Sequence, residues 1–103
     1  MISPSELIDA LEMEWSKDSG FLGLLRGGEF SDEGLERLLG LLNKINISEQ
    51  ETVNRRLVSL LWYIPIFMGW QRERLEENGM DVSKLDVAIT EITNRLEYVL
   101  GVP

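Results

Sequence analysis

The chain has 103 residues, carries 18 Asp and Glu against 10 Lys and Arg for a formal charge of −8, and contains neither Cys nor His. This length, with 44% hydrophobic and 27% charged residues, predicts one globular domain over residues 1–103. Without Cys and His, disulfides, thiolate metal sites, thiol nucleophiles and imidazole acid–base catalysis are excluded.

The first segment of the chain predicts an amphipathic helix. The segment Ser3–Glu6 is typical of a helix start, because Ser can cap the helix, Pro suits its first position and Glu can complete a capping box. Leu7, Leu11 and Trp15 then share one face at helical spacing. We therefore expect a helix over Pro4–Lys17.

Two further helices are predicted before residue 45. The apolar piece Phe21–Arg26, which lies between glycines, predicts one or two helical turns. Ser31 is placed to cap a helix over Asp32–Lys44. Asp32 and Glu33 fall in its first turn, where the helix dipole favours negative charge.

The second half predicts a long helical region around a proline. The segment Ser48–Glu51 has the pattern of a capping box, so we expect a helix from Glu49. Pro65 cannot donate to the carbonyl of Leu61, which leaves two alternatives. Residues 49–77 form either one kinked helix or two helices that meet near Pro65.

The last helix is expected over Ser83–Leu100, starting at Asp81 or Ser83 and ending before Gly101. No stretch alternates with a period of two, which makes strands improbable. The predicted fold class is all-α, a compact bundle of four to six helices that are mostly antiparallel.

The sequence indicates a cytoplasmic protein that does not enter membranes. The longest apolar run, Leu57–Trp70, spans 14 residues, whereas a bilayer needs about 20. The first 14 residues are acidic and lack the basic start of a signal peptide.

Catalysis, cofactors and metals are not expected. Glu14 and Glu73 are the carboxylates closest to apolar segments of the sequence, where burial can raise the pKa of a carboxyl group. No nucleophile and base form a recognisable pair. Residues 29–34 are acidic but lack the alternating ligand positions of a calcium loop. We predict that the protein is not an enzyme and has no catalytic residue, cofactor or metal site.

Nucleic acid is an unfavourable partner for this chain. The basic pairs Arg55/Arg56 and Arg72/Arg74 would lie roughly 25 Å apart on one helix, at about 1.5 Å per residue. The overall charge repels phosphate. We expect no nucleic-acid binding.

A protein partner is the favoured class. Residues 1–51 hold 11 acidic and 4 basic side chains, so they would attract a basic partner, although acidity also serves solubility alone. Trp62 and Tyr63 lie off the apolar stripe of their helix. They are either interface anchors or packed under another helix such as Phe21–Arg26.

A small, acidic, Cys-free helical domain with scattered aromatic residues resembles the helical immunity proteins of bacterial toxin systems, both colicin-type and contact-dependent. The resemblance implies one-to-one neutralisation of a cognate toxin, often a basic nuclease. The nuclease-colicin members carry a Tyr-Tyr-Pro element, from which residues 62–65 differ by an inserted residue, so no site is transferred from it.

On the immunity hypothesis, Glu29, Asp32 and Glu33 form a charged edge against the basic toxin, and Trp62 and Tyr63 are the aromatic anchors. The alternative is an assembly or adaptor subunit that homodimerises through Leu57–Trp70 and buries Trp62 and Trp70. The oligomeric state, monomer or homodimer, stays open.

Overall fold

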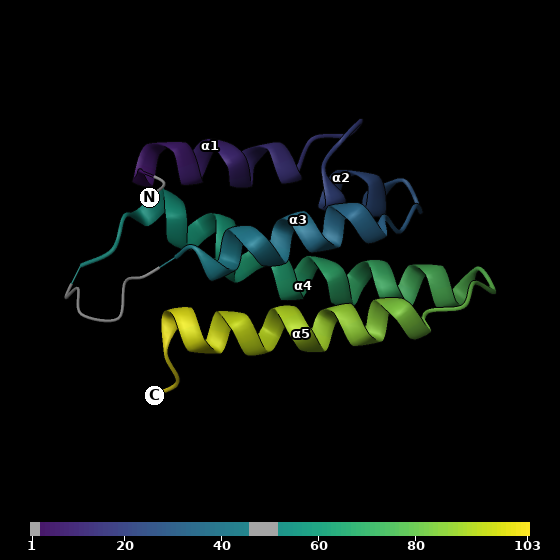
Figure 1. Cartoon of the computed structure of the whole chain (residues 1–103). Helices are drawn as coiled ribbons and strands as arrows, with labels where there is room; N and C mark the ends of the chain where they lie inside the picture. The colour runs from purple at the N-terminus through teal and green to yellow at the C-terminus, as the bar shows by residue number, and fades with distance from the viewer. Residues whose placement is uncertain (1–2, 46–51) are drawn as a thin grey trace.

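The computed structural model describes residues 3–45 and 52–103, and within these ranges the chain forms five α-helices and no strand (Figure 1). The helices are α1 (Pro4–Glu14), α2 (Phe21–Arg26), α3 (Asp32–Asn43), α4 (Arg55–Glu77) and α5 (Ser83–Leu100). The predicted all-α bundle is confirmed. The predicted bounds of the second and fifth helices match the structure, and the third ends one residue early because Lys44 is its C-cap.

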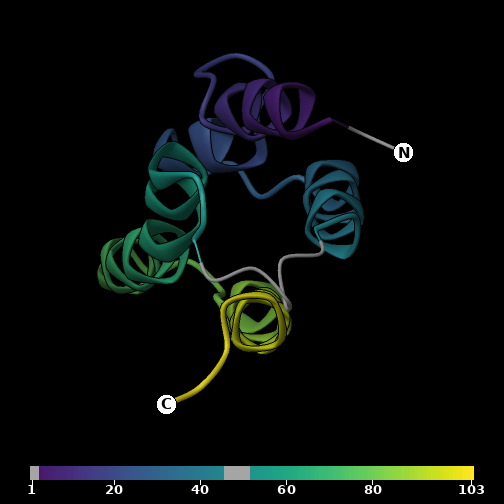
Figure 2. The same ribbon diagram turned by 90° about the vertical axis from the view of Figure 1, so that its left-hand side faces the viewer.

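The four longer helices lie side by side around one core, with α2 against α1, α3 and α4 (Figure 2). Among the longer helices that contact one another, α1 and α3 run antiparallel, as do α4 and α5, whereas α1 and α4 run parallel, as do α3 and α5 (Figure 1). Every helix contributes a fully buried side chain to this core. Examples are Leu11, Leu22, Leu38, Leu61 and Ile92.

Helix α1 ends at Glu14, three residues before the predicted end. The N–H groups of Trp15 and Ser16 bond to carbonyls three residues back, which closes the helix with a tight turn. The chain then passes so close to α2 that a Cβ on Gly23 would lie 1.8 Å from the carbonyl oxygen of Ser16. This close approach, and not local helix propensity, sets the end of α1.

Helix α4 begins at Arg55, six residues after the predicted start. Thr52–Asn54 are not helical, and the side chain of Asn54 caps the helix by accepting from the N–H groups of Arg56 and Leu57. The predicted capping box over residues 48–51 lies outside the described residues.

Pro65 lies inside one continuous helix, so the kinked-helix alternative is correct. The axis of α4 changes direction part-way along (Figures 1 and 2), as expected where a proline leaves the carbonyl of Leu61 without its usual donor.

The remaining helix starts largely follow the sequence. Ser3 and Ser31 cap α1 and α3, each accepting from the N–H three residues on. In place of a full capping box, the Ser3 hydroxyl donates to the Glu6 carboxylate. Before α5 the residue at the cap position is Val82, and the carboxylate of Asp81 accepts from the N–H of Ser83.

Candidate protein-binding surface

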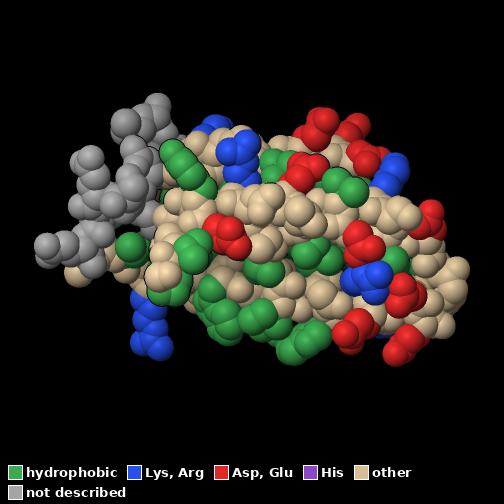
Figure 3. Space-filling view, turned by 90° about the horizontal axis from the view of Figure 1, so that it is seen from below, with side chains coloured by type: hydrophobic (Ala, Val, Ile, Leu, Met, Phe, Trp, Pro, Cys, Tyr) green, Lys and Arg blue, Asp and Glu red, His purple; other side chains and the backbone are tan. Residues whose placement is uncertain are grey.

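The middle of α4 carries a row of exposed apolar side chains. Trp62, Ile66 and Trp70 follow one another at intervals of four residues and are 51%, 38% and 58% exposed. Seen from below, hydrophobic side chains gather along one edge of the molecule, on the side formed by α4 and α5 (Figure 3). We call Trp62, Ile66 and Trp70 the α4 row. Helix α2, which the sequence offered as a cover, leaves the row open.

Tyr63 supports the row from underneath. Its ring lies 5.6 Å from that of Trp62 and 5.9 Å from that of Trp70, centroid to centroid, with steep edge-to-face angles. On its other side it packs at 6.1 Å against Trp15, which in turn meets Phe67. Tyr63 is half-buried in these contacts and makes one edge-to-face contact with each of the two tryptophans of the row.

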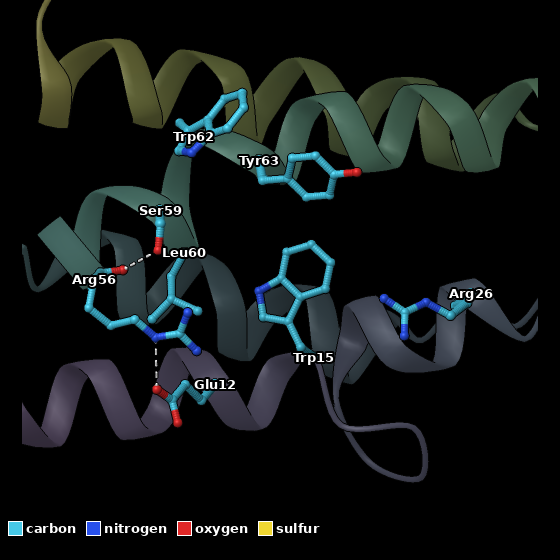
Figure 4. Close-up of a pocket in the computed structure, with 8 residues that line it drawn as sticks. All are labelled: Glu12, Trp15, Arg26, Arg56, Ser59, Leu60, Trp62 and Tyr63. Carbon is cyan, nitrogen blue, oxygen red and sulfur yellow. Dashed lines mark hydrogen bonds and ion pairs between the residues drawn. The ribbon is translucent and has the colours of Figure 1, made fainter.

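A hollow of about 490 Å³ opens beside the row, between α1 and α4 (Figure 4). Its walls include Trp15, Trp62 and Tyr63. On one side of the hollow Arg56 donates to the carboxylate of Glu12 at 3.1 Å. On the other side the guanidinium of Arg26 points toward Trp15. This hollow is wide and shallow, which suits a side chain of a partner better than a bound metabolite.

The three acidic residues predicted as a charged edge are all exposed at the junction of α2 and α3. Asp32 pairs with Lys84 of α5 at 3.3 Å, whereas Glu29 and Glu33 form no ion pair with any described residue. Both carboxylates are therefore available to a cation from outside. We call Glu29, Asp32 and Glu33 the acidic edge.

The structure does not bring the acidic edge and Trp62 together. The edge lies near the C-terminal end of α4, where Arg74 donates to the carbonyl of Arg26 and Lys84 reaches Asp32. Trp62 precedes Arg74 by twelve residues, which is about 18 Å along the helix axis at about 1.5 Å per residue. The predicted edge and anchors thus form two separate surfaces.

The carboxylate of Glu14, a candidate acid in the sequence, is buried and fully engaged. It accepts from both Nε and Nη2 of Arg37, at 2.6 and 2.9 Å, and from the N–H of Phe21 at 3.0 Å. The bond to Glu14, helped by the nearby charge of Glu33, raises the pKa of Arg37 above its usual value. Glu14 joins α1, α2 and α3, and the other candidate, Glu73, is exposed.

Comparison of the chain with protein-family models, curated proteins and solved structures gave no match. Among residues 3–45 and 52–103, no group of three carboxylates is placed to hold a metal ion. No helix of this described part is long and apolar enough to cross a membrane. The surface features themselves therefore carry the functional conclusion.

Sequence reasoning found Trp62 through its angular position but missed Ile66. The same spacing of four residues links Trp62, Ile66 and Trp70, and that spacing was the available signal. It was hidden because the row lies within the continuous apolar run Leu57–Trp70, which is typical of a buried core segment.

Proposed function

We propose that the chain is a non-catalytic protein-binding module, and that it acts in the cytoplasm as an immunity protein that neutralises a basic toxin by covering its working surface. The observation that carries the proposal is the acidic edge. Two of its carboxylates, Glu29 and Glu33, are exposed and form no ion pair with a described residue, and the charge of Glu33 acts on Arg37 only from a distance.

The mechanism is electrostatic steering followed by occlusion. A nuclease holds phosphate with clustered Lys and Arg side chains. These cationic groups are attracted by the exposed carboxylates of the acidic edge. The net charge of −8 extends this attraction and speeds the encounter. Once bound, the chain denies the basic surface to nucleic acid.

The test pairs the chain with the product of the reading frame immediately upstream, where the hypothesis places the toxin. Co-expression of the chain is expected to restore growth, and light scattering after size exclusion should show a one-to-one complex. The double variant Glu29→Lys/Glu33→Lys should weaken the complex at least tenfold, because two attractive charges become repulsive.

The matched control is Glu91→Lys/Glu97→Lys, which makes the same change in net charge with two exposed residues on α5. It should retain neutralisation. Equal loss in both variants would mean that only total charge matters, and unchanged neutralisation in the first variant would remove the acidic edge from the interface.

The α4 row favours a second candidate function, an assembly subunit that acts through homodimerisation. Trp62 and Trp70 are more than half exposed, and aromatic side chains of this kind are enriched at interface centres. The assignment of Trp62 and Tyr63 as toxin anchors stays a prediction.

A further inference from the structure

The exposed face of α4 has the spacing of a helix-packing seam. Its positions alternate between steps of four and three residues: Arg55, Ser59, Trp62, Ile66, Gly69 and Glu73. This alternation keeps one face in register with a neighbouring helix that crosses at about 20°. In the described part of the chain α4 packs on α1, α2 and α5, and none of these covers the seam.

Two pairs of residues on or beside this seam are placed symmetrically about Ile66. Trp62 lies four residues before Ile66 and Trp70 four residues after it. Arg55 lies eleven residues before Ile66 and Glu77 eleven residues after it. If a second α4 lies antiparallel across Ile66, each Trp62 meets a Trp70 and each Arg55 meets a Glu77.

The charges of this helix oppose its own dipole, which is the second argument for an antiparallel neighbour. No acidic residue lies in the first turn of α4, where Arg55 stands, and Glu77 is its last residue; Arg74, the basic residue of the last turn, is bonded to Gln71 and to the carbonyl of Arg26. A helix by itself favours the reverse order. Arg55 and Glu77 form no ion pair with any described residue, and an antiparallel copy supplies an opposite charge to both.

Gly69, on the same face, gives a third argument for a neighbouring helix. Glycine in a helix interior weakens the helix relative to alanine. A Cβ on Gly69 would meet nothing within 4 Å in the chain itself, so no internal contact requires glycine there. The absence of a side chain at Gly69 would matter to a second helix, because it leaves room for the indole of Trp62 from the other copy.

We infer that a second copy of this chain covers the α4 row, in an antiparallel pair whose two-fold axis passes Ile66. The 23 residues of α4 give a face about 34 Å long at about 1.5 Å per residue. An interface along it falls toward the small end of stable dimers, and we expect a dissociation constant of roughly micromolar size. This inference rests on the second candidate function, homodimerisation, and gives it a register; it uses a different surface from the immunity function.

The first experiment measures mass by sedimentation equilibrium from 1 to 300 μM, a range set about the roughly micromolar affinity expected. The unmodified chain should pass from monomer to dimer. Ile66→Glu places two carboxylates against each other at the axis and should leave only monomer. Val87→Glu, which alters a 58% exposed side chain on α5, is the matched control and should dimerise normally.

Charge exchange tests the antiparallel register. Arg55→Glu alone and Glu77→Arg alone each place like charges opposite one another and should weaken the dimer at least threefold. The double variant Arg55→Glu/Glu77→Arg restores opposite charges in both copies and should recover the original constant. Without that recovery, the two residues do not meet.

A cysteine reports the same register directly, because the chain contains none. Ile66→Cys should form a disulfide-linked dimer under mild oxidation, since facing residues of closely packed helices lie within disulfide range. Val87→Cys should not. A chain that stays monomeric at 300 μM, or whose dimer survives Ile66→Glu, overturns the inference. Glu29→Lys/Glu33→Lys should leave the dimer intact, so failure of one proposal is distinguishable from failure of the other.

Discussion

The carboxylate of Glu14 shows how a buried charge can hold a small bundle together. Its two oxygens accept from Arg37 in the middle of α3 and from the N–H of Phe21, the first residue of α2. The same Nη2 of Arg37 also donates to the carbonyl of Ser19. One ion pair thereby ties the turn between α1 and α2 to α3.

Arg37→Leu should destabilise the protein by about 1–3 kcal/mol, because it leaves the buried carboxylate of Glu14 with one donor only. Arg56→Leu is the control, since Arg56 also pairs with a glutamate, Glu12, but both side chains are exposed. Its cost should stay below about 1 kcal/mol. Urea unfolding at pH 7 compares the two, and similar costs would show that burial of Glu14 adds nothing.

Gly23→Ala tests the close approach of the Ser16 carbonyl to α2. The new Cβ would lie 1.8 Å from that oxygen, so backbone must shift, and we expect a loss of about 1–3 kcal/mol. Gly40→Ala, inside α3 with open space around its Cβ, should instead gain about 0.5–1 kcal/mol. Thermal unfolding of both variants measures the direction of each change in stability. An unchanged stability of Gly23→Ala would contradict the close approach of the Ser16 carbonyl to α2.

At the scale of elements, the α4–α5 hairpin is joined by a two-pronged ion pair. Arg72 donates to both oxygens of Asp86, at 2.5 and 3.2 Å, and also pairs with Glu76 on its own helix. The Arg72 guanidinium holds the pKa of Asp86 below its ordinary value of 3.8. Because the folded pKa is the lower one, the pair stabilises the fold fully above pH 3.8 and loses this effect as the pH falls below it.

Asp86→Asn should therefore lower the urea midpoint at pH 7 and have a smaller effect at pH 2.5, because below pH 3.8 the carboxyl takes up a proton in the unfolded chain and the contribution of the ion pair declines. Glu91→Gln removes an exposed carboxylate of the same helix that pairs with no described residue, and should change neither midpoint. An Asp86→Asn deficit that persists undiminished at pH 2.5 would assign the effect to something other than the ion pair.

The helices whose bounds the sequence predicts well are those with local signals at both ends. Glycines bracket Phe21–Arg26, and Gly101 with a positive φ follows Leu100. The two helix ends that differ by several residues from the prediction are the end of α1 and the start of α4. They depend on tertiary contacts or on competition between capping residues. Helix α1 stops where the chain must pass α2 at Gly23, and Asn54 caps α4 in place of a residue nearer Ser48.

The candidate surfaces were predictable residue by residue but not in combination. The angular position of Trp62 indicated exposure, and the place of Asp32 in a first turn explained its charge. The distance between them depends on how α3 and α4 pack, which no local pattern encodes. Tyr63 shares the off-stripe position of Trp62 yet packs on Trp15, because α1 lies on that side of α4 and not on the other.

On the scale of the whole molecule, charge and apolar surface are separated. The acidic edge lies at the junction of α2 and α3, near the C-terminal end of α4, and the α4 row lies along the middle of α4. We therefore expect that the proposed toxin at the edge would leave the row open to a second copy. Binding at the edge should weaken as salt rises, because it depends on long-range attraction.

Gly69→Ala links stability to association and separates the two roles of this glycine. Below about 1 μM, where the roughly micromolar dimer dissociates, it should raise the melting temperature as Gly40→Ala does, because both replacements favour a helix interior with open space. At 300 μM the unmodified chain and Gly40→Ala should both melt higher than when dilute, since the dimer stabilises the folded state. Gly69→Ala should lose most of that gain, because its methyl group occupies the space that the indole of the other copy needs. Differential scanning fluorimetry at both concentrations measures this, and a full concentration-dependent gain in Gly69→Ala would place the second copy elsewhere.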